Sequence, residues 1–206
     1  GVTLLQLYGM SEAGWICGNR HYLRAMGTVG PPAKHQEFII IGGSGDACAP
    51  GVEGEITIGG PQTCMGTISP EGVFEDLSES RIKTGDLGMI NEDGFVTVTG
   101  RTKDLIIRGG VNIAPLEIDN VLLAHSKVRE AAAVGVPDDI YGEEVVAFVS
   151  VIHGEELSEE DVKSWCAASL PAFKSPKNVY FTDDLPKSDR GKVLRDGLRN
   201  MWVSAK

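Results

Sequence analysis

Residues 100–113 read Gly100-Arg101-Thr102-Lys103-Asp104-Leu105-Ile106-Ile107-Arg108-Gly109-Gly110-Val111-Asn112-Ile113. Charged residues begin this stretch, and an apolar segment follows that predicts a strand ending in two adjacent glycines. Before it, glycines and prolines divide the chain into short segments of strand type, whereas helical periodicity appears after it. The stretch therefore predicts a change of fold class, from a β-rich first part to a compact α+β second part, joined near residues 101–104.

Several segments before this junction predict strands. Phe38–Ile41 is an apolar run that ends at two glycines, and Gly54–Gly59 alternates polar with apolar residues as a half-buried strand does. Gly85–Ile90 and Phe95–Thr99 predict a hairpin, because Asp93-Gly94 between them supplies turn residues. The first part is thus expected to be mostly β.

The second part combines strands with helices. Pro115 can begin a helix that runs to about His125, with acidic residues in its first turn. A second helix is expected before Pro171, because Ser158 and Asp161 have the spacing of a capping box. The apolar stripes that these helices would bury are Ile118, Val121 and Leu122 in the first, and Val162, Trp165, Cys166 and Leu170 in the second.

Further apolar runs predict the strands of the second part. Ala131–Val136 and Val145–Ile152 have strand length and are separated by the turn-like Pro137-Asp138-Asp139. Val179–Phe181 predicts a short strand, and a final helix is expected over about Val193–Trp202.

Length and composition limit the class of protein. With 206 residues, of which 42% are hydrophobic, the chain can form one or two domains with a real core. The formal net charge of −10 argues against a nucleic-acid partner. No transmembrane segment or signal peptide is indicated. The four cysteines form no CxxC pair, which favours reduced thiols and a cytoplasmic protein, and the oligomeric state is not indicated.

The charge is unevenly distributed along the chain. Residues 170–206 hold eight basic and four acidic residues, although the chain as a whole is acidic. This cationic tail is either a solvated surface or a site for a polyanionic ligand.

Four segments carry residues suited to chemistry, and most also have a purely structural interpretation. Leu7–Glu12 combines an aromatic ring, a glycine, a hydroxyl and a carboxylate, which suits a nucleotide and its metal but also a capped turn. Asp86 could accept both hydroxyls of a ribose or cap its own turn. The paired Gly109 and Gly110 would let a ligand approach the backbone closely. Lys192 could deliver charge to a phosphate or be an ordinary surface lysine.

In order and spacing these segments resemble the adenylate-forming superfamily of acyl-CoA synthetases, firefly-type luciferases and peptide-synthetase adenylation domains. The resemblance covers essentially the whole chain. The matches are Tyr8-Gly9-Met10-Ser11-Glu12 with Tyr-Gly-x-Ser/Thr-Glu, Gly54–Gly59 with Gly-Glu-Leu/Ile-x-Ile-x-Gly, Thr84-Gly85-Asp86 with Thr-Gly-Asp, Gly100–Glu117 with the Gly-Arg hinge element, and Pro186–Arg195 with Pro-Lys-x-x-x-Gly-Lys-x-x-Arg. The chain looks like the C-terminal portion of an AMP-forming acyl-CoA synthetase.

This resemblance implies a division into two domains. Residues 1–102 would form the C-terminal, β-rich part of the large domain that binds ATP and the acyl group. Residues 103–206 would form the small, mobile α+β domain at the C-terminus. Lys103 matches the hinge about which the small domain swings between two reaction steps.

The resemblance also implies roles in nucleotide binding. Tyr8 would stack near adenine, with Gly9 and Met10 in the same nucleotide-binding element. Asp86 and Arg101 would hold the ribose.

Other matching positions imply roles in catalysis and in binding the acceptor. Ser11 would contact the phosphate or the acyl group, and Glu12 would bind Mg²⁺. Lys192 would bind the nucleotide and stabilise the transition state of adenylation. Gly109 and Gly110 match the turn that admits the pantetheine arm of CoA.

The implied reaction joins ATP to a small-molecule carboxylic acid and then passes the acyl group to CoA, releasing AMP and pyrophosphate. The family's phosphate-binding loop is absent, and most of the acyl pocket is expected upstream of Gly1. The chain alone is therefore expected to be an inactive portion of a longer ligase. Loading of a carrier protein and a non-catalytic interaction module remain open as alternatives, and the acid is not indicated.

Overall fold

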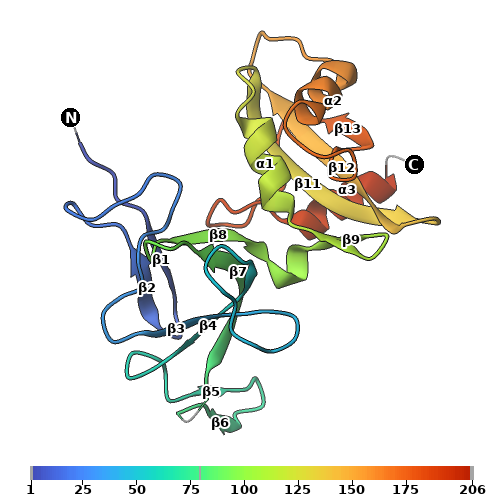
Figure 1. The fold of residues 1–206 in the computed structure, drawn as a ribbon. Helices are drawn as coiled ribbons and strands as arrows, with labels where there is room; N and C mark the ends of the chain where they lie inside the picture. The colour runs from blue at the N-terminus through green and yellow to red at the C-terminus, as the bar shows by residue number, and fades with distance from the viewer. Residues whose placement is uncertain (1, 79, 205–206) are drawn as a thin grey trace. The chain divides into compact units, whose positions relative to one another are not determined.

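The computed structural model describes residues 2–78 and 80–204, and the chain divides into two compact units (Figure 1). The first unit is Gly1–Thr102 and the second is Lys103–Lys206. A short 3-10 helix, Thr102–Asp104, spans the division. Among the described residues, no helix is long and apolar enough to cross a membrane.

The first unit is built on a four-stranded antiparallel sheet in the order β3-β4-β7-β8. Two separate hairpins, β1-β2 and β5-β6, accompany it (Figure 1). The strands are β1 Leu7–Met10, β2 Gly14–Gly18, β3 Glu37–Ile41, β4 Gly54–Gly59, β5 Gly66–Ile68, β6 Phe74–Asp76, β7 Ile82–Ile90 and β8 Val96–Arg101.

Apolar residues from the sheet and from the β1-β2 hairpin share one core. Ile56, Ile58 and Val96 of the sheet are fully buried, and Ile16 of β2 packs in the same cluster. The hairpin β7-β8 turns where it was predicted, with Asn91 accepting a hydrogen bond from the backbone of Phe95 at 2.8 Å. The strands predicted in this unit are confirmed, whereas the hairpins β1-β2 and β5-β6 were not predicted.

Over residues 103–204, the second unit contains a five-stranded sheet and three α-helices. The long hairpin β11-β12 is its centre, with β13 parallel to β12 and the small hairpin β9-β10 beside β12. The elements are β9 Ile106–Arg108, β10 Val111–Ile113, α1 Pro115–Leu123, β11 Val128–Asp138, β12 Gly142–Val151, α2 Glu159–Ala167, β13 Asn178–Phe181 and α3 Arg195–Ser204.

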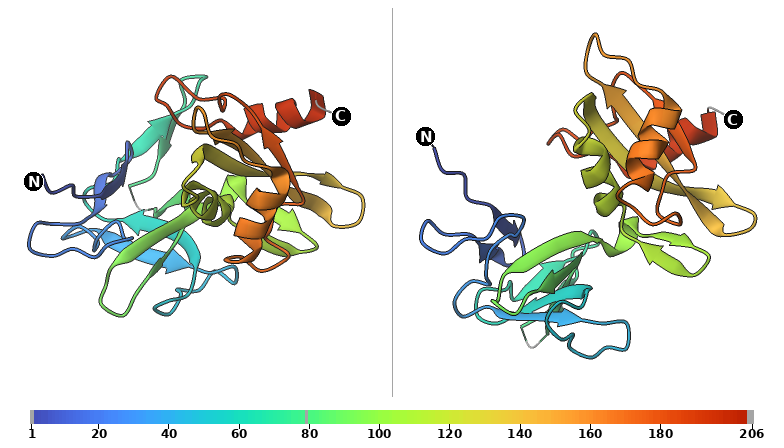
Figure 2. Two further views of the ribbon diagram at one scale, coloured as in Figure 1. Left: turned by 90° about the horizontal axis from the view of Figure 1, so that it is seen from above. Right: turned by 45° about the horizontal axis from the view of Figure 1, so that its top comes forward.

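Helices cover both faces of the β11-β12 hairpin (Figure 2). Ala131 and Ala133 face a cluster that includes residues of α1 and α2. Ala132 and Val134 face a second cluster, which includes Leu198 of α3. Because successive side chains of a strand point to opposite faces, burial on both sides explains the uninterrupted apolar run of β11.

Two predicted boundaries in this unit were wrong, and a third was approximate. Pro137-Asp138 belongs to β11 rather than to the turn, because β11 is an edge strand and proline is tolerated on an edge. The last helix starts at Arg195, since Val193 forms a β-bridge with Lys187. Helix α1 ends at Leu123, two residues before His125.

Helix α2 has the predicted capping box at Ser158 and Asp161. Its predicted apolar stripe is only partly correct, since Val162 and Cys166 are buried whereas Trp165 is 39% exposed. Leu170 is buried but lies beyond the end of the helix.

Candidate functional site

Asp86 lies at the centre of a polar cluster in the first unit. Its carboxylate accepts a hydrogen bond of 2.7 Å from the hydroxyl of Tyr8 and one of 2.8 Å from Nε of Arg101. The backbone N–H of Asp86 donates to Oγ1 of Thr84 at 3.1 Å, and that hydroxyl donates to the carbonyl of Ile56 at 2.8 Å. Three sequence segments thus meet at one carboxylate.

Strand pairing explains the position of this cluster. Asp86 of β7 pairs directly with Arg101 of β8, so their side chains lie on the same face of the sheet. Burial raises the pKa of Tyr8, and the neighbouring carboxylate of Asp86 adds to this rise, so the phenol stays a neutral donor. A carboxylate has about four lone-pair positions, so Asp86 keeps acceptor capacity for further hydroxyl groups.

Gly9 and Met10 continue β1 from Tyr8. A Cβ on Gly9 would lie 2.2 Å from the carbonyl oxygen of Gly14, so the two strands require glycine at this position. The side chain of Met10 packs against the core of the unit.

Ser11 and Glu12 lie in the turn that joins β1 to β2. The backbone of this turn is fixed by a 3.2 Å hydrogen bond from Ala13 N–H to Met10 O and one of 2.7 Å from Cys64 N–H to Glu12 O. The side chains of Ser11 and Glu12 have no hydrogen-bond partner among the described residues. They are therefore available for a ligand but do not contact Asp86.

The second unit carries the other predicted residues. Lys192 is exposed in a loop that is closed by a 2.8 Å hydrogen bond from Leu194 N–H to Pro186 O. Ser188 donates its N–H to the carbonyl of Lys192 at 2.8 Å, and its hydroxyl accepts the N–H of Lys192 at 3.2 Å. The loop backbone is ordered by these bonds, whereas the ammonium group of Lys192 has no partner among the described residues.

Gly109 and Gly110 form the turn of the β9-β10 hairpin. Their φ angles are +58° and +81°, which matches the two-residue hairpin turn that favours glycine at both positions. The N–H of Gly109 donates to the carbonyl of Tyr141 at 2.8 Å. Lys103 is exposed in the 3-10 helix and is the first residue of the second unit.

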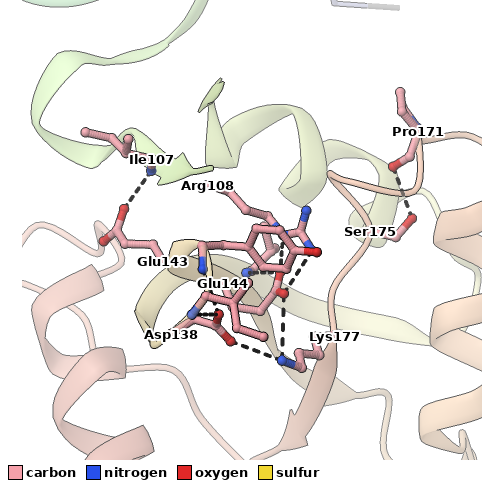
Figure 3. Close-up of polar contacts among 11 residues, drawn as sticks. Ile107, Arg108, Asp138, Glu143, Glu144, Pro171, Ser175 and Lys177 are labelled. Carbon is pink, nitrogen blue, oxygen red and sulfur yellow. Dashed lines mark hydrogen bonds and ion pairs between the residues drawn. The ribbon is translucent and has the colours of Figure 1, made fainter. Parts of the chain in front are cut away.

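Sequence reasoning missed a charged network next to the Gly109-Gly110 turn (Figure 3). Arg108 donates to both carboxylate oxygens of Glu144, at 2.5 and 3.0 Å, and stacks on the ring of Tyr141 at 4.1 Å. Lys177 lies 3.1 Å from Asp138 and 3.8 Å from Glu144. Although burial opposes it, the bonds from Arg108 and from the N–H of Val145 lower the pKa of Glu144.

A second buried pair, Asp119 with Arg195, was also missed. Arg195 donates to Asp119 at 2.6 Å and to the carbonyl of Ala133 at 2.6 Å, while Asp119 accepts the N–H of Ala133 at 2.7 Å. Burial raises the pKa of Asp119, and the guanidinium of Arg195 opposes that rise. The only signal in the sequence was an acidic residue on the apolar face of α1, next to Ile118.

Known protein families match both units. The family described as AMP-binding enzyme matches residues 1–67, and the AMP-binding enzyme C-terminal domain matches residues 117–192. The chain belongs to the adenylate-forming superfamily. The expected fold class of this adenylate-forming chain, the C-terminal part of that fold, is confirmed.

Relatives of this adenylate-forming chain are CoA ligases. It is 40% identical over 200 residues to probable CoA ligase CCL9 of Humulus lupulus, which covers 95% of this chain and 38% of that protein. It is 38% identical over 200 residues to oxalate–CoA ligase of Arabidopsis thaliana, covering 95% of this chain and 39% of that protein. The chain spans about two fifths of the length of these curated relatives.

Solved structures agree with the sequence relatives. ATP-bound MatB from Rhodopseudomonas palustris matches with a TM-score of 0.85 and 33% identity, over 97% of this chain and 40% of that one. The Bacillus subtilis o-succinylbenzoate CoA synthetase MenE, in complex with its acyl-adenylate, matches with a TM-score of 0.83 and 32% identity, over 95% of this chain and 40% of that one. The amide bond synthetase McbA from Marinactinospora thermotolerans matches with a TM-score of 0.85 and 31% identity, over 98% of this chain and 42% of that one.

Proposed function

We propose that the protein to which this chain belongs is an AMP-forming carboxylate–CoA ligase. In the first step a carboxylate oxygen attacks the α-phosphorus of ATP, and pyrophosphate leaves. In the second step the CoA sulfur attacks the acyl carbon, and the bond to AMP breaks. The observation that carries the proposal is the cluster of Tyr8, Asp86 and Arg101, formed by three separate segments in a chain whose relatives are CoA ligases.

We assign nucleotide binding to the first unit, as the C-terminal part of a larger ATP- and acyl-binding domain. The spare lone pairs of Asp86 accept the ribose hydroxyls, and Arg101 holds the carboxylate in position from the side. The ring of Tyr8 lies against adenine, with the backbone of Gly9 and Met10 alongside it. The absence of a hydrogen-bond partner for Ser11 among the described residues supports its contact with a phosphate or acyl oxygen.

A magnesium ion fits Glu12. Mg²⁺ at nucleotide sites is usually held by one or two protein carboxylates together with phosphate oxygens and water. The described residues contain no cluster of three or more metal ligands, whereas the side chain of Glu12 is unengaged and lies next to Ser11. The ion would supply charge that balances the phosphates, and Glu12 would hold it.

We assign the second unit to a mobile domain that serves both steps in turn. Lys192, on an ordered loop with an unengaged ammonium group, stabilises the charge that develops on the phosphate during adenylation. Gly109 and Gly110, which lack side chains at a tight turn, admit the pantetheine arm of CoA. Lys103 absorbs the change in backbone angles between the two arrangements.

The first experiment measures ATP–pyrophosphate exchange with a panel of carboxylic acids. It compares the 206-residue chain with the full-length product of its gene. Acid-dependent exchange by the full-length product supports the proposal. Exchange by the 206-residue chain alone would contradict the expectation that the phosphate-binding loop and most of the acyl pocket lie upstream of it. No exchange by either protein with any acid would favour a non-catalytic interaction module.

The acceptor of the second step is tested separately, because one similar structure is an amide bond synthetase. Acyl-adenylate formed in the first step is offered CoA, a primary amine or a phosphopantetheine-bearing carrier protein. Release of AMP with CoA alone supports the ligase. If AMP is released only with the amine, or only with the carrier protein, that compound rather than CoA is the acceptor, and the proposed first step is unaffected.

A further inference from the structure

Two pairs of a partly buried arginine and a buried carboxylate lie in the second unit, and each joins a functional loop to the β11-β12 hairpin. We propose that Asp119–Arg195 positions the Lys192 loop for adenylation, and that Arg108–Glu144 positions the Gly109-Gly110 turn for thioester formation. The inference rests on the proposed function, because it assigns one pair to each of the two steps. These four are positioning residues and do not themselves contact the substrate.

The Asp119–Arg195 pair fixes the helical side of the Lys192 loop. Arg195 is the first residue of α3 and lies three residues after Lys192. Its guanidinium binds Asp119 of α1 and the carbonyl of Ala133 of β11, both at 2.6 Å, and its side chain is only 15% exposed. The start of α3 is therefore joined to two other elements by a planar group with fixed geometry.

The other side of the Lys192 loop is also anchored. Lys187 forms an ion pair with Glu130 of β11 and a β-bridge with Val193. Both ends of the loop therefore bind β11, at Glu130 and at Ala133, and the exposed Lys192 lies between them.

The Arg108–Glu144 pair fixes the strand that leads into the glycine turn (Figure 3). Arg108 immediately precedes Gly109 and binds Glu144 of β12 through two parallel hydrogen bonds. The adjacent Glu143 accepts the N–H of Ile107 at 2.6 Å. Tyr141 makes two contacts here. Its ring lies under the guanidinium of Arg108, and its carbonyl accepts the N–H of Gly109.

The energetics of buried ion pairs favour a positioning role over a purely stabilising one. Desolvation of two charges offsets most of their attraction, so such pairs add little to net stability. Their directional hydrogen bonds nevertheless define the geometry, and a misplacement of about 1 Å can reduce a reaction rate about 100-fold. The side chains of Asp119 and Glu144 are only 8% and 7% exposed, so water cannot replace a lost partner without rearrangement.

The test measures the two half-reactions separately in the full-length gene product. Arg195→Met and Arg108→Met keep much of the apolar stem and remove the hydrogen bonds. Arg129→Met is the matched control, because Arg129 lies on β11 and binds Ser150, Asp183 and Asp184, which lie outside the loop that Pro186 and Leu194 close. Pyrophosphate release in a single turnover reports adenylation, and thioester formation from supplied acyl-adenylate reports the second step.

A crossed pattern is expected. Arg195→Met should slow adenylation about 100-fold and leave thioester formation at the wild-type rate, whereas Arg108→Met should do the reverse. Arg129→Met should affect neither step selectively. Parallel losses in both steps that follow the melting temperature of each variant would overturn the proposal.

Two further variants separate positioning from misfolding and from a failure of the proposed function. Arg195→Lys and Arg108→Lys keep the charge but lose the planar fork, so they should give the same crossed pattern even if the methionine variants do not fold. In a Lys192→Ala background, Arg195→Met should cause no additional loss of adenylation, and a full additional loss would contradict action through Lys192. If Lys192→Ala itself leaves adenylation unchanged, the proposed function of Lys192 fails.

Discussion

Replacing Asp86 with alanine tests the nucleotide site most directly. The variant removes the acceptors for the ribose hydroxyls, but it also releases Tyr8 and Arg101, which can then turn toward the nucleotide or water. The net loss should therefore be close to one charge-assisted hydrogen bond, about 1.5–3 kcal/mol. This corresponds to an increase of about 10- to 150-fold in the dissociation constant of ATP.

The folded state should survive this change. The neighbouring contact from Thr84 to the carbonyl of Ile56 does not use the Asp86 side chain, and Arg101 is about half exposed. Titration calorimetry on the full-length gene product gives the dissociation constant, and circular dichroism checks the fold.

A nucleotide without ribose hydroxyls supplies the control for Asp86→Ala. Wild type and variant should bind 2′,3′-dideoxy-ATP equally well, because this nucleotide has no ribose hydroxyl that could donate a hydrogen bond to Asp86. An unchanged affinity for ATP in a folded variant, or an equal loss for both nucleotides, would refute the assignment and leave Asp86 as a residue that joins Tyr8 and Arg101 within the first unit.

Three other predictions concern the second unit and the division between units. Lys192→Ala should sharply reduce adenylation and largely spare thioester formation from supplied acyl-adenylate; equal losses would contradict its role at the phosphate. Lys103→Pro should block one half-reaction, because proline fixes φ near −65° and restricts Thr102, whereas single-turnover rates that fall in parallel with the melting temperature would reject the hinge. Hydrogen bonds from the N–H groups of Tyr141 and Ile140, together with Lys177, lower the pKa of Asp138 to about 2, so its contribution to stability should be complete above about pH 4 and lost as the pH falls toward about 2. Urea unfolding at a series of pH values should therefore show Asp138→Asn less stable than wild type above about pH 4 and equal to it near pH 2, and a constant difference would be evidence against this linkage.

The parts of the fold that depend on local sequence were predictable. The strands Glu37–Ile41 and Gly54–Gly59 follow from apolar runs and alternation, and the capping box of α2 follows from two residues three positions apart. The strand that ends at Gly109-Gly110 was predicted and corresponds to β9, whereas its hairpin partner β10 was missed because a strand of three residues gives too short a pattern. Pro137 was misplaced because nothing local in the sequence identifies β11 as an edge strand.

The candidate site was predictable as a set of motifs but not as a set of contacts. Tyr8 and Asp86 are 78 residues apart, and only the tertiary structure brings the hydroxyl of one to the carboxylate of the other. The same holds for Asp119 and Arg195, which are 76 residues apart. Arg195 was present in a predicted motif, but its partner on α1 could be identified only once the helix was packed against β11.

Side chains bind backbone groups on the outer edge of β11, with which no strand of the described residues pairs. Asp119 and Arg195 bind the N–H and the carbonyl of Ala133, Arg199 binds the carbonyl of Gly135 at 3.3 Å, and Pro137 has no N–H to offer. An open edge of eleven residues would be a template for a strand from another molecule, and so a starting point for aggregation. By binding these backbone groups, the side chains occupy hydrogen-bonding positions that a strand from another molecule would otherwise use.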